Sequence, residues 1–247
     1  MKKLILAAFA ATTLAGGAQV RTNASVVVTI AKKELGGVQL WENGPYWAEC
    51  NVGATKPEEY GYYFWWGDTV GYTRSGGKWW PARLYTDVTW VSSTGKKMGK
   101  SPFDESKCPT FDKKAQLQSA GYIDSTGKLV AAHDAATAHL DSPWRMPTSD
   151  EMQALVNNCT TTWITTNGVT GRLVTGKGAY ADRSIFLPAA GNGTGTRLDN
   201  PGSYGFYWSS TFETDRGYAA WYLGIYSGNV YHDIQNCFFG VPVRPVR

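Results

Sequence analysis

The sequence predicts a small α+β domain in which one strongly marked helix lies among short strands and long ordered loops. The helix is expected within residues 142–159, where Pro147 keeps the preceding residue extended and Thr148 can cap the first turn. Glu151 stands three residues after Thr148 and completes a capping box. The apolar face of this helix is formed by Met152, Leu155, Val156 and Cys159. Around it the chain is rich in Trp, Tyr, Gly and Thr, which is typical of strands and turns.

The first 37 residues are expected to lie outside the main domain. Residues 1–18 have the features of a signal peptide, with Lys2 and Lys3 before a short apolar stretch; cleavage after residue 24 is the alternative. Its removal lowers the formal charge from +4 to +2, which leaves no electrostatic argument for nucleic-acid binding. Residues 19–37 are interpreted as a linker or an N-terminal strand, so the domain proper spans residues 38–247. No transmembrane span is expected once the signal peptide is removed.

The first part of the domain is expected to hold a hairpin and a core segment. Apolar residues alternate within residues 38–50 around Asn43-Gly44, a strong hairpin signal. The aromatic run at 59–68 is interpreted as a buried strand and turn rather than a ligand platform. Residues 70–120 have weak periodicity and are expected to form a long surface insertion, partly hairpin.

A second helix is expected just before the main one, and strands after it. The second helix spans residues 131–140, and its His133 and His139 fall on different faces, so they are poor joint metal ligands. Strands are expected at 160–166, 172–175, 184–188, 207–211, 219–226 and 229–239, with a turn-rich loop at 192–196. The domain therefore has one or two helices and short antiparallel sheets.

The tract 204–239 stands out by its composition. It holds twelve aromatic side chains, and no lysine follows Lys177. Tyr, Trp, Ser, Gly and Asn give large contact area at a low entropy cost, as in the binding loops of antibodies. The tract is therefore a candidate binding surface, with core packing as the alternative. The cysteines Cys50, Cys108, Cys159 and Cys237 allow three disulfide pairings, among which the spacing does not choose, and a buried free thiol at Cys159 is the alternative.

Six motifs together resemble the Fibrobacter succinogenes major paralogous domain family over about residues 38–247. They are the segments 46–55, 59–68, 144–148, 185–191, 207–211 and 243–246. That family is similar to the formylglycine-generating-enzyme (sulfatase-modifying factor) branch of the C-type lectin fold, in which an Arg-Leu-Pro-Thr segment opens a helix as Arg145–Thr148 does here. The resemblance thus implies a C-type lectin-like domain.

The closing tract, 204–247, also resembles the variable region of target proteins of diversity-generating retroelements, in which selected positions of a lectin-fold sheet are diversified to bind different ligands. This resemblance implies a framework that includes Tyr207, Trp208, Trp221 and Gly240. It implies ligand-binding positions at Phe212, Glu213, Asp215, Arg216, Tyr218, Tyr222, Tyr226, Tyr231, His232, Asp233, Gln235, Phe238 and Phe239, with Gly224, Cys237 and Pro242 also on display. Because Cys237 falls among them, it is expected to be the least structural cysteine.

The leading hypothesis is therefore an exported, secreted or cell-surface protein that binds a protein or glycan ligand through this tract. The related enzyme's copper-binding cysteine pair is not present, so its activity does not transfer; neither a cofactor nor a metal is expected, and Leu198–Pro201 is only a weak calcium candidate. The first alternative is a formylglycine-generating-enzyme-like or carbohydrate-active enzyme, with Asp68, Glu213 and Asp233 as candidate carboxylates. The second is a structural surface protein.

Overall fold

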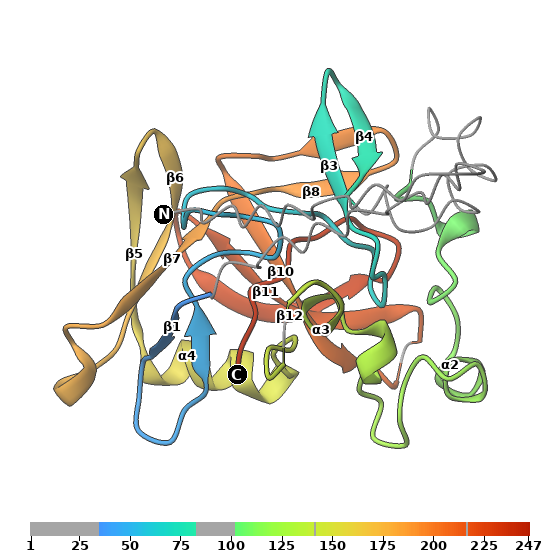
Figure 1. Ribbon diagram of the computed structural model, residues 1–247, viewed down its shortest axis with the longest axis horizontal. Helices are drawn as coiled ribbons and strands as arrows, with labels where there is room; N and C mark the ends of the chain where they lie inside the picture. Colours follow the sequence, from blue (N-terminus) through green and yellow to red (C-terminus); the bar gives the residue numbers. More distant parts are fainter. Residues whose placement is uncertain (1–34, 83–101, 141, 216) are drawn as a thin grey trace, which may run out of the picture. The chain divides into compact units, whose positions relative to one another are not determined.

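Short antiparallel strands are the most frequent regular elements of the fold, and a few helices lie among them, so the α+β class is confirmed (Figure 1). The computed structural model describes residues 35–82, 102–140, 142–215 and 217–247. The expected signal peptide, most of the expected linker and part of the expected insertion at 70–120 lie outside these residues. None of the described helices is long and apolar enough to cross a membrane.

Within the described residues, the strands form five small sheets. Three are two-stranded: β1 (Gly37–Gln39) with β2 (Tyr46–Ala48), β3 (Tyr72–Ser75) with β4 (Lys78–Pro81), and β8 (Asn192–Thr194) with β9 (Arg197–Asp199). One three-stranded sheet contains β5 (Thr160–Thr166), β6 (Val169–Thr175) and β7 (Ser184–Pro188), and the other contains β10 (Tyr204–Phe212), β11 (Ala219–Tyr226) and β12 (Val230–Asn236). All strand pairs within these sheets are antiparallel.

The two Asn-Gly hairpins form as the sequence predicts. Asn167 and Gly168 both have positive φ angles, 50° and 80°, and join β5 to β6 through the two-residue turn that this dipeptide favours. Asn43, with φ of 58°, turns the chain between β1 and β2. The expected loop at 192–196 is wrong in part, because it contains β8 and the turn into β9.

The main helix is α4 (Ser149–Asn158), and its capping box is complete, so this prediction is confirmed. The Thr148 hydroxyl accepts from the Glu151 amide at 3.2 Å, and the Glu151 carboxylate accepts from the Thr148 amide at 2.8 Å. Arg145 holds the same carboxylate with two hydrogen bonds of 2.7 and 2.6 Å. Met152 and Leu155 are buried on the apolar face.

The expected helix at 131–140 is broken by Asp134. A 3₁₀ turn, η2 (Ala131–His133), precedes it and α3 (Ala135–His139) follows. The buried Asp134 carboxylate caps α3 through the Thr137 amide and also accepts from the Met146 amide, so it is committed to joining two segments. Helix α2 (Lys114–Ser119) was not predicted, and it is a third α-helix among the residues that the structure describes. This part of the chain also contains the 3₁₀ turns η1 (Glu105–Lys107) and η3 (Gly178–Tyr180).

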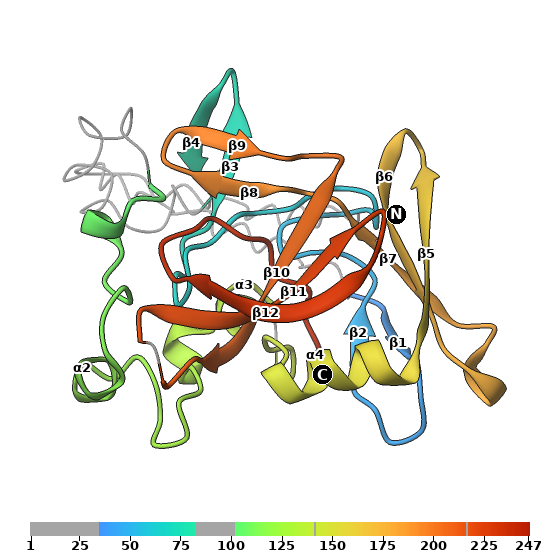
Figure 2. The ribbon, with the colours of Figure 1, turned by 180° about the vertical axis from the view of Figure 1, so that it is seen from behind.

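The sheet β10–β11–β12 separates two buried clusters. Helix α4 packs against all three of its strands (Figure 2). Met152 and Leu155 of α4 belong to the same buried cluster as Leu223 and Ile225 of β11. Trp208, Phe212 and Tyr222 lie in the other cluster, with Phe64 and Trp66 of the aromatic run. The expectation that the run at 59–68 fills the core is thus confirmed.

The closing segment ties distant parts together through Arg244, whose side chain is 1% exposed. Its guanidinium donates to the Asn51 side chain and to the carbonyls of Ala48, Glu49 and Phe186 at 2.8 to 3.0 Å. One buried cation thus saturates four acceptors from two separate segments.

Candidate functional site

The face of the β10–β12 sheet away from α4 carries a group of aromatic rings, which we call the aromatic face. The register places Tyr204 opposite Tyr226, and Phe206 in line with Gly224 and Tyr231. Side chains that alternate along a strand share a face, so these rings point to the same side as Trp208 and Tyr222. The aromatic face consists of Tyr204, Phe206, Tyr222, Tyr226 and Tyr231.

The five rings contact one another in a closed network. Tyr204 stacks on Tyr226 with 5.6 Å between ring centroids and on Phe206 with 6.3 Å. Tyr231 meets Tyr226 and Tyr222 edge to face at 6.1 and 5.9 Å, and Phe206 lies 5.5 Å from Tyr222. Such pairs contribute about 0.5–1.5 kcal/mol each beyond their buried area, so the rings hold one another in place.

The exposure of the rings varies across the face. Tyr204 is 38% exposed, and Phe206, Tyr226 and Tyr231 are half-buried. Tyr222 is only 6% exposed, because the buried cluster beneath covers its end of the sheet. The outer part of the aromatic face is therefore open to a ligand, and the inner part is core.

A second group of rings, which we call the turn cluster, lies beside the connection between β10 and β11 and the end of β12. It consists of Phe111, Tyr218, Phe238 and Phe239, all half-buried. Phe111 lies 4.9 Å from Tyr218 and 5.3 Å from Phe238, which stacks on Phe239 at 4.6 Å. Tyr218 has a φ of 63°, which is unusual for a bulky residue, and two backbone hydrogen bonds, to Asp112 and from Cys237, hold it there.

Several predicted binding positions are not on the surface, and these expectations are wrong. Phe212 is 1% exposed and belongs to the core, and Glu213 is 7% exposed with its carboxylate accepting from the Asp215 amide. Cys237, expected to be on display, is fully buried, as is Pro242. A side chain at position 224 would displace the Tyr231 ring, because a Cβ there would lie 2.3 Å from it.

The remaining predicted positions lie around the aromatic face or behind it. His232 points to the α4 side, where it stacks on Trp221 and lies 3.2 Å from the Ser149 hydroxyl; burial lowers its pKa. Asp233 is exposed and Gln235 half-buried, and the register puts both on the aromatic side. Asp215 is exposed in the turn before β11, and Arg216 lies outside the described residues.

Each of the three candidate carboxylates accepts a hydrogen bond from a nearby backbone amide. Asp68 is buried and accepts from the Val70 and Gly71 amides at 2.9 Å, and burial raises its pKa to about 7. Asp233 accepts from the Ile234 amide, next to it in the chain. Among the described residues no group of three metal-ligating side chains comes together, and Asp199, in the calcium candidate, pairs with Arg197 at 3.2 Å.

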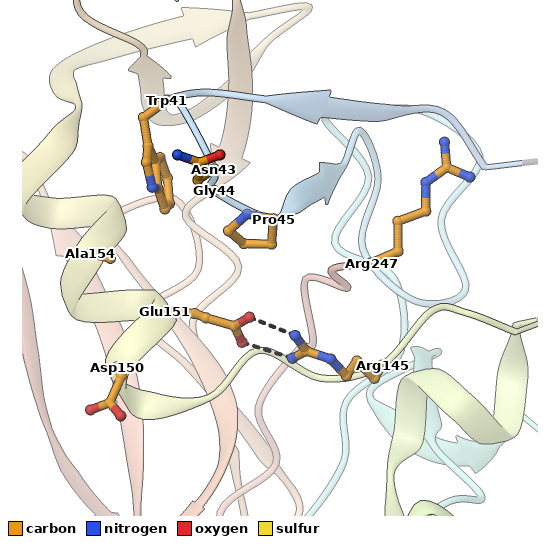
Figure 3. A pocket seen from close by; sticks show the side chains of 9 residues that line it. All are labelled: Trp41, Asn43, Gly44, Pro45, Arg145, Asp150, Glu151, Ala154 and Arg247. Carbon is orange, nitrogen blue, oxygen red and sulfur yellow. Dashed lines mark hydrogen bonds and ion pairs between the residues drawn. The ribbon is translucent and has the colours of Figure 1, made fainter.

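A hollow of about 490 Å³ lies elsewhere, between the first turn of α4 and the turn that joins β1 to β2 (Figure 3). Trp41 and Pro45 line one side, and the paired Arg145 and Glu151 lie at its base. Burial acts to raise the pKa of Glu151, but hydrogen bonds from Arg145 and Thr148 outweigh it and hold that pKa below its usual value. Arg145 and Glu151 form an ion pair, and Glu151 also caps α4, so the charges in the hollow are explained by the stability of this helix.

Three rings of the site are not among the binding positions predicted from the sequence. Tyr204 and Phe206 alternate with Trp208 along one strand and so share its face, and this alternation could have indicated them. Phe111 lies outside the C-terminal tract, and no local pattern connects it with Tyr218 or Phe238.

Comparison with known proteins adds nothing to this picture, since no family model, curated protein or solved structure matches the chain.

Proposed function

We propose that this is an exported or cell-surface binding protein that recognises a partner protein through the aromatic face and the turn cluster. The observation that carries the proposal is a network of contacting rings whose outer members, Tyr204, Phe206, Tyr226 and Tyr231, are partly exposed, on a sheet whose other face packs against α4. Tyr and Phe lose little conformational entropy on binding, and rings already fixed by their neighbours lose less. Such preorganised aromatic surfaces are typical of binding hot spots.

A protein partner fits these rings better than a glycan does. Tyr204, Tyr226 and Phe206 turn their flat faces toward one another, with interplanar angles of 20° and 11°. Ring edges and tyrosine hydroxyl groups are what remain for a ligand, and these suit the mixed apolar and hydrogen-bonding surface of a protein. The flanking Asp233 and Gln235 add polar contacts at the rim.

The proposal extends to the fold and its family. We propose a C-type lectin-like domain related to the Fibrobacter succinogenes major paralogous domain family. The motif Arg145–Thr148 opens α4 as that resemblance implies, and the closing tract returns beside it through a backbone bridge from Arg145 to Val246. We further propose that the exposed positions of the tract are diversified by a retroelement. Sequencing this locus in many isolates tests this: variation confined to exposed codons, and absent at Phe212, Tyr222 and Gly224, is expected.

The binding proposal is tested by capturing surface proteins on the immobilised chain. The test variant changes Tyr204, Tyr226 and Tyr231 to Ser, and the matched control changes Tyr46 and Trp80, which are each 44% exposed and lie on other strands. We expect the test variant to lose capture and the control to keep it. Treating the captured material with protease should abolish rebinding; survival after protease but loss after periodate would instead identify a glycan. Equal capture by both variants would overturn the proposal.

A further inference from the structure

Two of the four cysteines, Cys108 and Cys237, lie in the same buried cluster although they are far apart in the sequence. Cys108 is 6% exposed and follows η1, and Cys237 is fully buried and follows β12. Cys159 belongs to the other cluster, on the α4 side of the sheet. The fold therefore indicates which two cysteines lie in the same part of the core, which their spacing in the sequence does not.

The hydroxyl of Thr110 contacts the Cys108 thiol and lies near the Cys237 thiol. It is 3.2 Å from the Cys108 sulfur, and it donates to the carbonyl of Trp66. Trp66 in turn donates its amide to the Cys237 carbonyl at 2.8 Å. Burial raises the pKa of Cys237; proximity to the Cys108 thiol raises it further, and the nearby Thr110 hydroxyl acts in the opposite direction. The two sulfurs thus share one small polar contact in an apolar environment.

We propose that Cys108 and Cys237 form a disulfide when the chain folds in an oxidising compartment. Of the cysteine pairs, this one is supported by a common buried cluster and a common hydrogen-bonding partner. The bond would join the segment between η1 and α2 to the end of β12. Disulfides of exported proteins typically link such distant segments and restrict the unfolded chain.

The reaction requires an oxidant, which we take to be a protein or small-molecule disulfide. One cysteine thiolate attacks a sulfur of that disulfide, breaks its S–S bond and forms a mixed disulfide, and the other oxidant sulfur leaves as a thiolate. The second cysteine thiolate attacks the cysteine sulfur of the mixed disulfide and releases the remaining oxidant sulfur as a thiolate. Two electrons and two protons thus pass from the chain to the oxidant, which ends as two thiols. Because burial raises the pKa of Cys108 to about 11, the folded thiol is a poor nucleophile, and the exchange must occur before the cluster closes.

The bond would also order the turn cluster, a consequence that rests on the proposed function. Phe111 lies three residues after Cys108, and Phe238 follows Cys237 directly. Since Phe111 contacts both Phe238 and Tyr218, a covalent link between their backbones would fix the ring arrangement before a ligand arrives.

The experiment unfolds the whole chain in reductant and refolds it in a mixture of reduced and oxidised glutathione. We expect thiol titration in denaturant to find two of the four thiols, and peptide mapping to find one link, between residues 108 and 237. Reduction should lower the melting temperature by roughly 5–15 °C. The variant Cys108→Ser should show no such shift, and the double variant Cys50→Ser, Cys159→Ser should form the same bond.

Four free thiols in the refolded native protein, a glutathione adduct, or a link between other cysteines would overturn the proposal. The wild-type peptide map decides the matter even if a variant fails to fold. These measurements need no ligand, so their failure is distinct from failure of the binding proposal. If the link forms and the ring variants still bind like the wild type, only the proposed function falls.

Discussion

Gly224 lies at the centre of the aromatic face, and the Tyr231 ring packs directly over it. A Cβ at this position would lie 2.3 Å from Tyr231 Cζ, closer than real contacts allow. We therefore expect Gly224→Ala to displace the Tyr231 ring and to destabilise the fold by about 1–3 kcal/mol, the usual cost of overpacking. Urea denaturation measures the change in the free energy of unfolding.

The predicted clash between a residue 224 side chain and the Tyr231 ring can be tested by removing the ring. In a Tyr231→Ala background the added methyl group has no ring to displace, so Gly224→Ala should cost much less there. A double-mutant cycle measures this coupling directly. Equal costs in the two backgrounds would show that the clash is relieved in some other way.

Asp68 is expected to make stability depend on pH. Burial raises its folded-state pKa to about 7 from a usual value of 3.8, so the folded state holds the proton more tightly than the unfolded state. This contribution is complete below about pH 4 and is lost as the pH rises toward 7, by at most about 4 kcal/mol.

The pH profile of Asp68→Asn checks this assignment. The variant cannot ionise, so its stability should change less between pH 4 and pH 7 than that of the wild type, as followed by thermal or urea unfolding. Backbone amides of Val70 and Gly71 favour the carboxylate and reduce the effect. Parallel profiles for the two proteins would contradict the raised pKa.

At the scale of single residues, strand alternation could predict which side chains share a face but not which of them are covered. Tyr222, Tyr226 and Tyr231 have similar surroundings in the sequence, yet Tyr222 is buried and the other two are half-exposed. Tyr222 belongs to a buried cluster that also contains Phe64 and Trp66, which come from a distant segment of the chain. No local sequence pattern indicates which side chains that cluster includes.

Helix α4 depends on Glu151, which completes the capping box and pairs with Arg145. Glu151→Ala should destabilise the fold by about 1–2 kcal/mol, since it removes a cap and a favourable charge in the first turn. Glu151→Gln, which can keep the cap, should cost less. Because the folded-state pKa of Glu151 is lowered, the wild type's advantage over Glu151→Gln should disappear as the pH falls through that value. An advantage that persists in acid would contradict the ion pair's role.

Elements that depend on local signals were predictable, and those that depend on distant contacts were not. The capping box and the Asn167-Gly168 turn are complete within a few residues, so the sequence predicts α4 and the β5–β6 hairpin. The break at Asp134 depends on the Met146 amide, which the carboxylate binds from twelve residues away. The positions of α2 and of β8 likewise have weak local signals.

Arg244 connects the closing segment with two distant parts of the domain. Arg244→Met should destabilise the fold by more than about 3 kcal/mol, because it removes the donor to the buried carbonyls of Ala48 and Phe186 and to the buried Asn51 side chain. The control, Arg197→Met, removes an exposed ion pair and should cost less than about 1 kcal/mol. Similar losses in the two variants, measured by chemical denaturation, would contradict this account.

At the scale of the whole molecule, the candidate site combines the C-terminal tract with a segment from the middle of the chain. Composition predicted the tract as a surface, but Phe111 joins it only through the fold. The packed sheet supports rings that already contact one another, and this arrangement is the basis of the proposed binding function.

The most direct test is the dissociation constant for the captured partner protein, measured by calorimetry. The account predicts that changing Tyr204, Tyr226 and Tyr231 to Ser weakens binding at least about 30-fold, as expected when hot-spot rings are lost. Changing Tyr46 and Trp80 should alter it less than about threefold. Equal affinities for both variants and the wild type, with both variants folded, would contradict the claim that the aromatic face is the binding surface.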